Sequence, residues 1–240
     1  MKKLERLLRE NRTRKILDIG TGVGNFIFLL TQVVKDYDQI IGLDTSKRSI
    51  EIATSYFTDQ PKIKFMEKNG EHTDFPDDYF DLVCLSNSLH HLGEPQTIFM
   101  EMERVLKPNG IILVHEMISE PLTSQQQSHK IIHHFSAEID RYLGAIHDET
   151  LTKKQIEEKL NEYSSCELEE SWIPEHPDKH QFSAEEIEHI VNSVDQMVSR
   201  IKDQEKIQYF KDKAEIIKVY IQENGFDLAT EYMFALRNQN

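Results

Sequence analysis

Three glycines at alternate positions and an aspartate one strand later are the residues of this chain best suited to bind a ligand. Gly20, Gly22 and Gly24 follow the apolar run 15–19, and Asp44 closes a second apolar run. Glycine tolerates positive φ and lets backbone N–H groups approach a ligand closely. A carboxylate at the end of the second run can accept hydrogen bonds from ribose hydroxyls. The pattern therefore predicts a strand, a tight turn, a helix and a second strand that together bind a nucleoside.

An acidic residue, Asp18, stands two positions before the first glycine. The order of Asp18, the glycine loop and Asp44 resembles the first motifs of class I S-adenosylmethionine-dependent methyltransferases. A nicotinamide-binding fingerprint would place its third glycine at position 25, where this chain has Asn25. The resemblance implies that the glycines contact S-adenosylmethionine through backbone groups, that Asp18 orients its amino-acid end, and that Asp44 holds its ribose. The full set of expected donor-binding residues is Asp18, Gly20, Gly22, Gly24, Asp44, Thr45, Asn69, Gly70 and Ser86.

The adenine would lie against Asn69 and Gly70, by their position after the third predicted strand. Aspartate is the commoner residue of the family at this position, so Asn69 departs from the pattern. Its amide oxygen can still accept a hydrogen bond from the adenine amino group. Ser86 ends the fourth predicted strand and should face the methyl donor, because ligands of open α/β sheets lie beyond the carboxyl ends of the strands.

Two adjacent histidines, His90 and His91, follow that strand in the sequence Leu-His-His-Leu. This sequence resembles the same position in methyltransferases of the ubiquinone/menaquinone-biosynthesis type. An imidazole there could act as a general base if the acceptor must lose a proton, and His91 is the first candidate, with His90 and His115 beside it. Hydrogen bonding to the backbone or capping of a helix is the alternative role for each.

A histidine cluster lies further along the chain, with His129 and His133 four residues apart. This spacing puts both imidazoles on one helix face and is compatible with a metal. No third ligand is fixed by the spacing, so a histidine-rich polar face is favoured and no metal site is predicted. The segment after the fifth strand covers the acceptor in the resembling family, so Phe135, His134 and Tyr142 are expected to contact substrate.

Strand and helix patterns alternate through the first two-thirds of the chain, which indicates a doubly wound parallel sheet. We expect strands near 15–19, 39–44, 62–67, 80–86 and 110–116, and helices near 24–36, 46–57 and 95–106. The resemblance implies a Rossmann-like, seven-stranded, mostly parallel sheet with helices on both faces, completed by strands at 166–173 and 227–237. It also implies a helical C-terminal insertion between those two strands.

This reading divides the chain into a donor-binding core, 1–120, and an acceptor side, 121–240, with the helical insertion at 175–225. The apolar stripes of 183–224 suit a buried core, a lid or a self-association face, so a homodimer through these helices is left open.

The amino-acid composition disfavours some classes of binding partner. The chain of 240 residues has a net charge of −14, and without the basic segment 2–15 the remainder carries 21 basic against 40 acidic side chains. Such a surface disfavours nucleic acid. No apolar run is long enough to span a membrane, and two cysteines give neither a disulfide framework nor a zinc site, so the cytoplasm is expected.

The predicted function is methyl transfer from S-adenosylmethionine to a small-molecule acceptor. A catalytically silent S-adenosylmethionine-binding regulatory or partner protein is the alternative, and a nicotinamide oxidoreductase is a weaker one.

Overall fold

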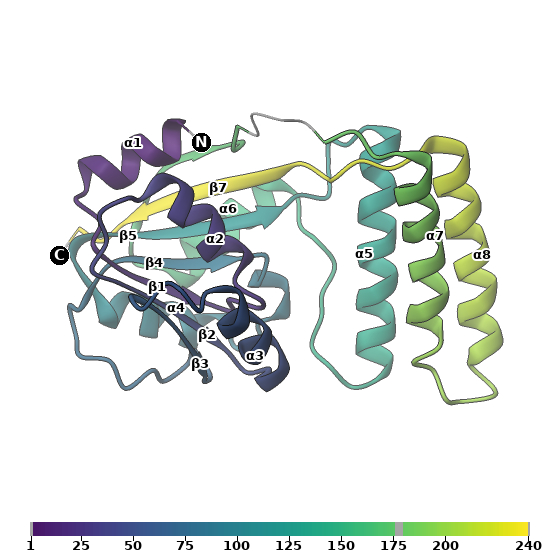
Figure 1. Cartoon of the computed structure of the whole chain (residues 1–240), viewed down its shortest axis with the longest axis horizontal. Helices are drawn as coiled ribbons and strands as arrows, with labels where there is room; N and C mark the ends of the chain where they lie inside the picture. Colours follow the sequence, from purple (N-terminus) through teal and green to yellow (C-terminus); the bar gives the residue numbers. More distant parts are fainter. Residues whose placement is uncertain (1, 176–179, 240) are drawn as a thin grey trace. The chain divides into compact units, whose positions relative to one another are not determined.

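The structure is a computed structural model that describes residues 2–175 and 180–239. The chain forms two compact units (Figure 1). Unit 1 comprises Met1–Glu116, Lys154–Pro177 and Glu231–Asn240, and unit 2 comprises Met117–Lys153 and Asp178–Thr230. The units are interleaved in sequence, whereas the expected domains, 1–120 and 121–240, were consecutive.

Unit 1 is built on a seven-stranded sheet with the strand order β3-β2-β1-β4-β5-β7-β6. Strands β1 to β5 pair in parallel, and β6 pairs antiparallel with β7. The strands are β1 Lys15–Ile19, β2 Gln39–Asp44, β3 Ile63–Glu67, β4 Phe80–Ser86, β5 Leu106–Met117, β6 Glu167–Trp172 and β7 Glu231–Arg237. The predicted Rossmann-like, mostly parallel sheet is confirmed.

The strand order reverses at β1, which lies between β2 and β4. Right-handed crossovers running in opposite directions from this point put the connecting helices on opposite faces of the sheet. The helices that accompany the sheet are α1 Lys2–Glu10, α2 Asn25–Val33, α3 Lys47–Tyr56, α4 Pro95–Val105 and α6 Lys153–Tyr163. Ligands of such sheets bind beyond the carboxyl ends of the strands at the reversal point, so we expect the ligand site at the loop after β1.

Helix α1 closes one face of this sheet. Its leucines, Leu4, Leu7 and Leu8, recur at helical spacing and are buried in one apolar cluster with Ile16 of β1 and Leu30 of α2. Helix α1 is thus an integral part of unit 1, and its basic residues are left on the outside.

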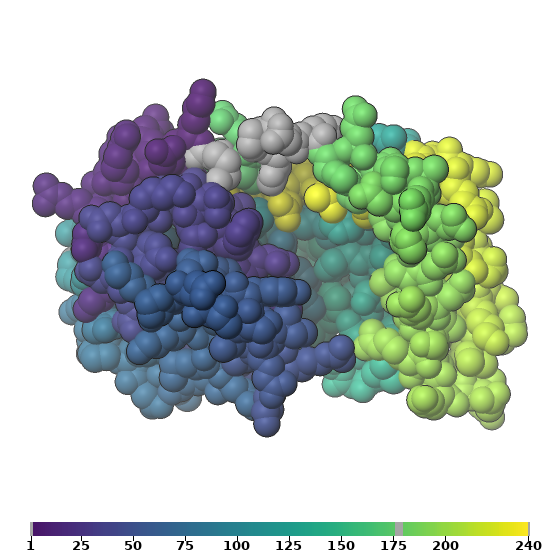
Figure 2. All heavy atoms as spheres, viewed as in Figure 1, coloured from purple at the N-terminus to yellow at the C-terminus, as the bar shows by residue number. Residues whose placement is uncertain are grey.

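Unit 2 contains three helices, α5 Ser124–Tyr142, α7 Ala184–Val198 and α8 Ile207–Asn224. Their apolar stripes meet in one core, which includes Ile139 of α5, Val194 of α7 and Ile217 of α8. Side chains of α7 and α8, green and yellow in Figure 2, form one continuous surface. The buried members of the predicted stripes therefore serve the core of unit 2, and self-association through these helices stays a prediction.

Several element boundaries differ from the expected ones, among them the end of α2 at Val33 and the start of β7 at Glu231. Strand β5 begins at Leu106, not near 110, because the chain passes through an irregularity at the predicted Pro-Asn-Gly turn and keeps its pairing with β4 on both sides. Helix α5 ends at Tyr142 because Leu143 no longer has helical geometry and Gly144 takes a positive φ of 88°. The sequence predicts a longer helix over 121–147, because apolar residues continue past this end.

Candidate functional site

The glycine loop joins β1 to α2 at the carboxyl end of the sheet's reversal point. Gly20, Gly22 and Gly24 have φ values of 71°, 53° and 87°, a region that side-chain-bearing residues rarely adopt. Gly24 is the N-cap of α2, so the loop turns directly into the first turn of that helix. The unpaired N–H groups of a helix start favour a polar or anionic ligand group.

The three glycines have different surroundings. A Cβ on Gly20 would lie 2.4 Å from the Ser88 hydroxyl, so this glycine allows the loop to approach the segment after β4. A Cβ on Gly22 would meet no heavy atom within 4 Å. The Ser88 hydroxyl donates to the carbonyl oxygens of Gly20, at 3.2 Å, and of Ser86, at 2.9 Å. Gly20 is therefore explained by packing, whereas Gly22 borders open space that a ligand can fill.

Asp44 ends β2 and is fixed by two backbone donors. The Gly22 N–H donates to its Oδ2 and the Ser46 N–H to its Oδ1, each at 2.8 Å. Each carboxylate oxygen has a second lone pair, so both can still accept a hydrogen bond from a ligand hydroxyl. Thr45, the next residue, is exposed beside it.

Asp18 has the most unusual environment in the site. Its side chain is 0% exposed, and neither carboxylate oxygen has a hydrogen-bond partner among the described residues. Burial raises the pKa of Asp18 to about 7, although the nearby Thr21 hydroxyl lowers it, and the Asp44 charge acts in the same direction as burial. A buried carboxyl without a partner is costly for the fold and calls for a ligand group that would satisfy it.

Asn69 and Gly70 follow β3. The Asn69 Oδ1 accepts a hydrogen bond from the Glu71 N–H at 3.0 Å, and the side chain is exposed. Gly70 is buried, and a Cβ there would lie 2.4 Å from Cγ2 of Ile19. The fold itself thus requires glycine at 70, and the role of both residues toward adenine stays a prediction.

Ser86, at the end of β4, is linked to two other strands. Its hydroxyl lies 3.0 Å from Nδ1 of His115 on β5, and Nε2 of His115 lies 3.2 Å from a carboxylate oxygen of Glu231 on β7. The His115 ring also stacks on Phe26 of α2, with ring centroids 5.3 Å apart. His115 therefore connects the site edge of three strands.

Glu116 is a site residue that the sequence reasoning missed. It is buried, and its Oε1 accepts from the backbone N–H groups of Ser88 and Leu89 at 2.8 and 2.7 Å. Its Oε2 lies 3.1 Å from Nδ1 of His90. An acidic residue that closes an apolar strand was the available signal, the same one that identified Asp44.

The two candidate bases are thereby distinguished. His90 is buried and held by Glu116, whereas His91, its neighbour in the short 3₁₀ turn Leu89–His91, is exposed. The role of either histidine as a general base stays a prediction.

The expected acceptor-side residues lie in unit 2. Phe135 is buried in the unit's core, 6.2 Å from the Phe210 ring, and His134 lies 2.8 Å from the Thr150 hydroxyl. The exposed Tyr142 donates to Asp203 at 2.7 Å. Each has a contact within its own unit, and a role toward substrate stays a prediction.

Histidines of helix α5 make separate contacts within unit 2. Nδ1 of His129 accepts from the Ala229 N–H at 3.0 Å, while the His133 ring packs edge-on against His147, with centroids 4.9 Å apart. The predicted shared face of His129 and His133 is therefore directed at two different sets of contacts.

Comparison with known proteins agrees with the geometry. Residues 17–114 match the family described as a methyltransferase domain. The predicted resemblance to the methyltransferase family is confirmed over these residues, which include the glycine loop, Asp18 and Asp44.

The curated proteins to which this chain is similar include methyltransferases. The ubiquinone/menaquinone biosynthesis C-methyltransferase UbiE of Vibrio parahaemolyticus serotype O3:K6 is 29% identical over 116 residues, which is 46% of this chain and 45% of that protein. The chain thus matches less than half the length of the first curated relatives.

Two solved structures share the fold. A putative methyltransferase from Bacillus halodurans C-125 superposes with a TM-score of 0.62 over 100% of both chains at 15% identity. Geranyl diphosphate C-methyltransferase from Streptomyces coelicolor A3(2), in complex with S-adenosyl-L-homocysteine, gives 0.55 at 9% identity, over 99% of this chain and 76% of that one.

Within the described part of the chain, every helix is too short or too polar to cross a membrane.

Proposed function

We propose that this protein transfers a methyl group from S-adenosylmethionine to a small-molecule acceptor. The observation that carries the proposal is the joint position of Asp44, fixed by the Gly22 N–H, and of the partnerless buried Asp18 at the carboxyl end of β1. The methyltransferase-domain match over 17–114 and the similarity to C-methyltransferases support the same chemistry.

The residues present suit this donor. Its ammonium group would pair with the Asp18 carboxylate, which otherwise lacks a partner, and its ribose hydroxyls would donate to Asp44. The open space next to Gly22 leaves room for the ligand against the loop backbone. When bound, S-adenosylmethionine supplies an electrophilic methyl group on a sulfonium sulfur.

The chain's own part in the reaction is binding, alignment and protection from water. Glu116 fixes the backbone of Ser88 and Leu89, and so holds the segment after β4 against the glycine loop. The exposed His91, on that segment, is the residue we assign to remove a proton from an acceptor that carries one.

The acceptor is assigned to a broad class. The matched residues 17–114 form the donor-binding half, and the net charge of −14 disfavours a nucleic acid. A neutral or cationic small molecule agrees best with this charge.

One observation favours a second function, a donor-binding protein without transfer. The buried His90 is committed to Glu116, which leaves His91 as the exposed imidazole on this segment. Formation of S-adenosylhomocysteine distinguishes the two functions.

The test is an acceptor screen with methyl-labelled S-adenosylmethionine, including quinones, phenols and amines, with reactions that lack the protein as the blank. Label transfer by the parent protein above this blank is expected. Tight binding of S-adenosylhomocysteine with no transfer to any acceptor would favour the silent protein, and no binding at all would overturn both.

A further inference from the structure

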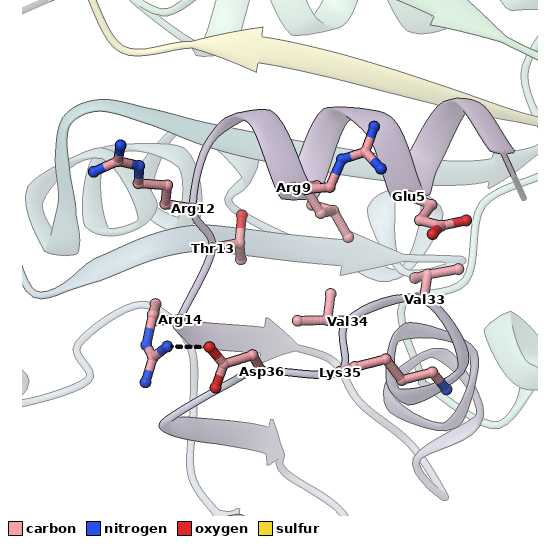
Figure 3. Close-up of a pocket in the computed structure, with 10 residues that line it drawn as sticks. Glu5, Arg9, Arg12, Thr13, Arg14, Val33, Val34, Lys35 and Asp36 are labelled. Carbon is pink, nitrogen blue, oxygen red and sulfur yellow. Dashed lines mark hydrogen bonds and ion pairs between the residues drawn. The ribbon is translucent and has the colours of Figure 1, made fainter.

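A second pocket lies in unit 1 at the amino end of the sheet, between α1 and the end of α2 (Figure 3). Its volume is about 490 Å³, within the range of small-molecule sites. We call it the basic pocket; it is lined by Glu5, Leu8, Arg9, Arg12, Thr13, Arg14, Val33, Val34, Lys35 and Asp36. It precedes β1, whereas the glycine loop follows β1, so five residues of extended strand, about 16 Å, separate the two places.

The charges in the pocket are unbalanced. Arg14 is neutralised, because it binds Asp36 at 2.6 Å and Asp38 at 2.5 Å. Arg9 and Arg12 make no side-chain hydrogen bond or ion pair within the described chain, although Glu5 stands four residues before Arg9. Lys35 donates to the Thr31 carbonyl oxygen, which leaves its charge without a carboxylate. In a protein of net charge −14, three such cations around one cavity are a local exception.

Arg12 lies at a backbone position whose conformation other residue types adopt more readily. The N–H groups of Arg12 and Thr13 donate to the carbonyl oxygens of Arg9 and Leu8, the pattern of a Schellman ending of α1. Arg12 occupies its left-handed position, with φ 48°, where glycine or asparagine is favoured. An arginine there strains the backbone, and among the described residues its guanidinium has no hydrogen bond or ion pair that would offset the strain.

The wall and floor add two further features. Thr13 is 4% exposed, and its hydroxyl has no hydrogen-bond partner among the residues described. Leu8, Val33 and Val34 are the apolar part of the lining, which we call the floor, and Figure 3 shows Val33 and Val34 between the side chains of Arg9 and Lys35. Cations and an orphaned hydroxyl suit an anionic group, and the floor suits a hydrocarbon chain.

We propose that the basic pocket binds an amphiphilic anion, with its phosphate or carboxylate held by the exposed side chains of Arg9, Arg12 and Lys35 and its apolar chain over Leu8, Val33 and Val34. Such a head group could belong to a free metabolite or to a membrane lipid, and the chemistry of recognition is the same. The site is separate from the donor site and does not depend on the proposed transfer activity. Helix α2 begins at the glycine loop and ends at this pocket, so one rigid element borders both.

The test titrates the full chain with decyl phosphate by calorimetry, with decanol and inorganic phosphate as probes that lack the charge or the chain. Arg9→Gln combined with Arg12→Asn removes two pocket charges, and asparagine tolerates the left-handed position. Lys2→Gln combined with Arg6→Gln is the matched control, because it removes the same charge from α1 outside the pocket.

The parent protein should bind decyl phosphate more tightly than decanol or inorganic phosphate. The pocket variant should bind decyl phosphate at least tenfold more weakly than the parent, and the control variant should bind it as tightly as the parent. Unchanged melting of the pocket variant in circular dichroism, and unchanged S-adenosylhomocysteine binding, would show that the fold and the donor site are intact. Absence of decyl phosphate binding, or equal loss in both variants, would overturn the proposal.

A second arm identifies the source of the head group. Sedimentation with vesicles of phosphatidylglycerol and phosphatidylcholine is compared with vesicles of phosphatidylcholine alone. Anionic-vesicle binding that only the pocket variant loses supports a lipid, and decyl phosphate binding without vesicle binding supports a free metabolite. Vesicle binding that both variants lose equally would show a diffuse charge effect and contradict a lipid site in the pocket.

Discussion

The carboxylate of Asp44 accepts a hydrogen bond from the Gly22 N–H at 2.8 Å. This bond joins the end of β2 to the centre of the glycine loop at the end of β1, so one acidic side chain both shapes the loop and faces the expected ribose. The Ser46 N–H holds its other oxygen. A carboxylate fixed in this way is preorganised for a ligand.

Asp44→Asn should weaken binding of S-adenosylhomocysteine at least tenfold, or about 1.4 kcal/mol. An amide has one acceptor oxygen, so its NH₂ group would face either the Gly22 or the Ser46 N–H, and the charge that strengthens both bonds is lost. Calorimetric titration measures the effect. Asp59→Asn, at an exposed aspartate, removes the same charge and should bind like the parent; equal affinity of all three proteins would contradict the role of Asp44.

Donor affinity should rise with pH through about 7 because of Asp18. Burial raises the pKa of this carboxyl from its model-compound value of 3.8 to about 7, so the free protein holds it largely neutral at pH 6 and largely ionised at pH 8. Pairing with a ligand ammonium requires the ionised form, and the affinity should increase about tenfold between these two pH values.

Titration of S-adenosylhomocysteine at pH 6 and pH 8 tests this, with Asp18→Asn as the variant that should lose the dependence. The same shift acts on stability in the opposite direction. The folded state binds a proton that the unfolded state has released, so the free energy of unfolding should fall between pH 4 and pH 7 more steeply in the parent than in Asp18→Asn. Identical pH profiles would contradict the assigned environment of Asp18.

Gly20→Ala and Gly22→Ala should separate folding from binding. Both positions have positive φ, which costs alanine about 1–2 kcal/mol. At Gly20 the methyl group would also collide with the Ser88 hydroxyl, for a total of about 2–4 kcal/mol. At Gly22 it enters open space, so urea unfolding should show the smaller loss there.

Binding should show a large effect at Gly22. Its added methyl group would occupy the space assigned to the donor, and the affinity for S-adenosylhomocysteine should fall at least tenfold although the variant is folded. A Gly22→Ala protein that binds like the parent would place the ligand elsewhere.

His90 and His91 should respond differently to alanine. Loss of the buried His90 ring leaves Glu116 without one of its partners, and the free energy of unfolding should decrease by about 2–3 kcal/mol. His91 is exposed, and its replacement should change stability by no more than about 1 kcal/mol. Slower methyl transfer by His91→Ala, with unchanged donor binding, would then report its chemistry; unchanged transfer would exclude it as the base.

The positions of the glycine loop and of Asp44 in the fold could be predicted closely from the sequence, because their signals are local. Gly20, Gly22 and Gly24 stand next to the strand that they follow, and Asp44 closes an apolar run. Strand period and turn residues fixed β1 to β4 within a residue or two for the same reason.

The rest depends on pairs that are far apart in the chain. Ser88 and Glu116 are separated by 28 residues, and their contact follows from the parallel pairing of β4 with β5. The stripes on α5, α7 and α8 showed which faces are apolar but not that they would meet one another. The burial of Asp18 without a partner depends on both neighbouring strands, so its pKa could not be predicted from its position alone.

The most direct test of the central claim, that the glycine loop, Asp18 and Asp44 form a site for S-adenosylmethionine, is calorimetric titration of the full chain with S-adenosylhomocysteine beside NADH. We expect micromolar binding of S-adenosylhomocysteine and no measurable binding of NADH. Tight binding of NADH, with none of S-adenosylhomocysteine, would contradict the account and identify the sheet as a nicotinamide site.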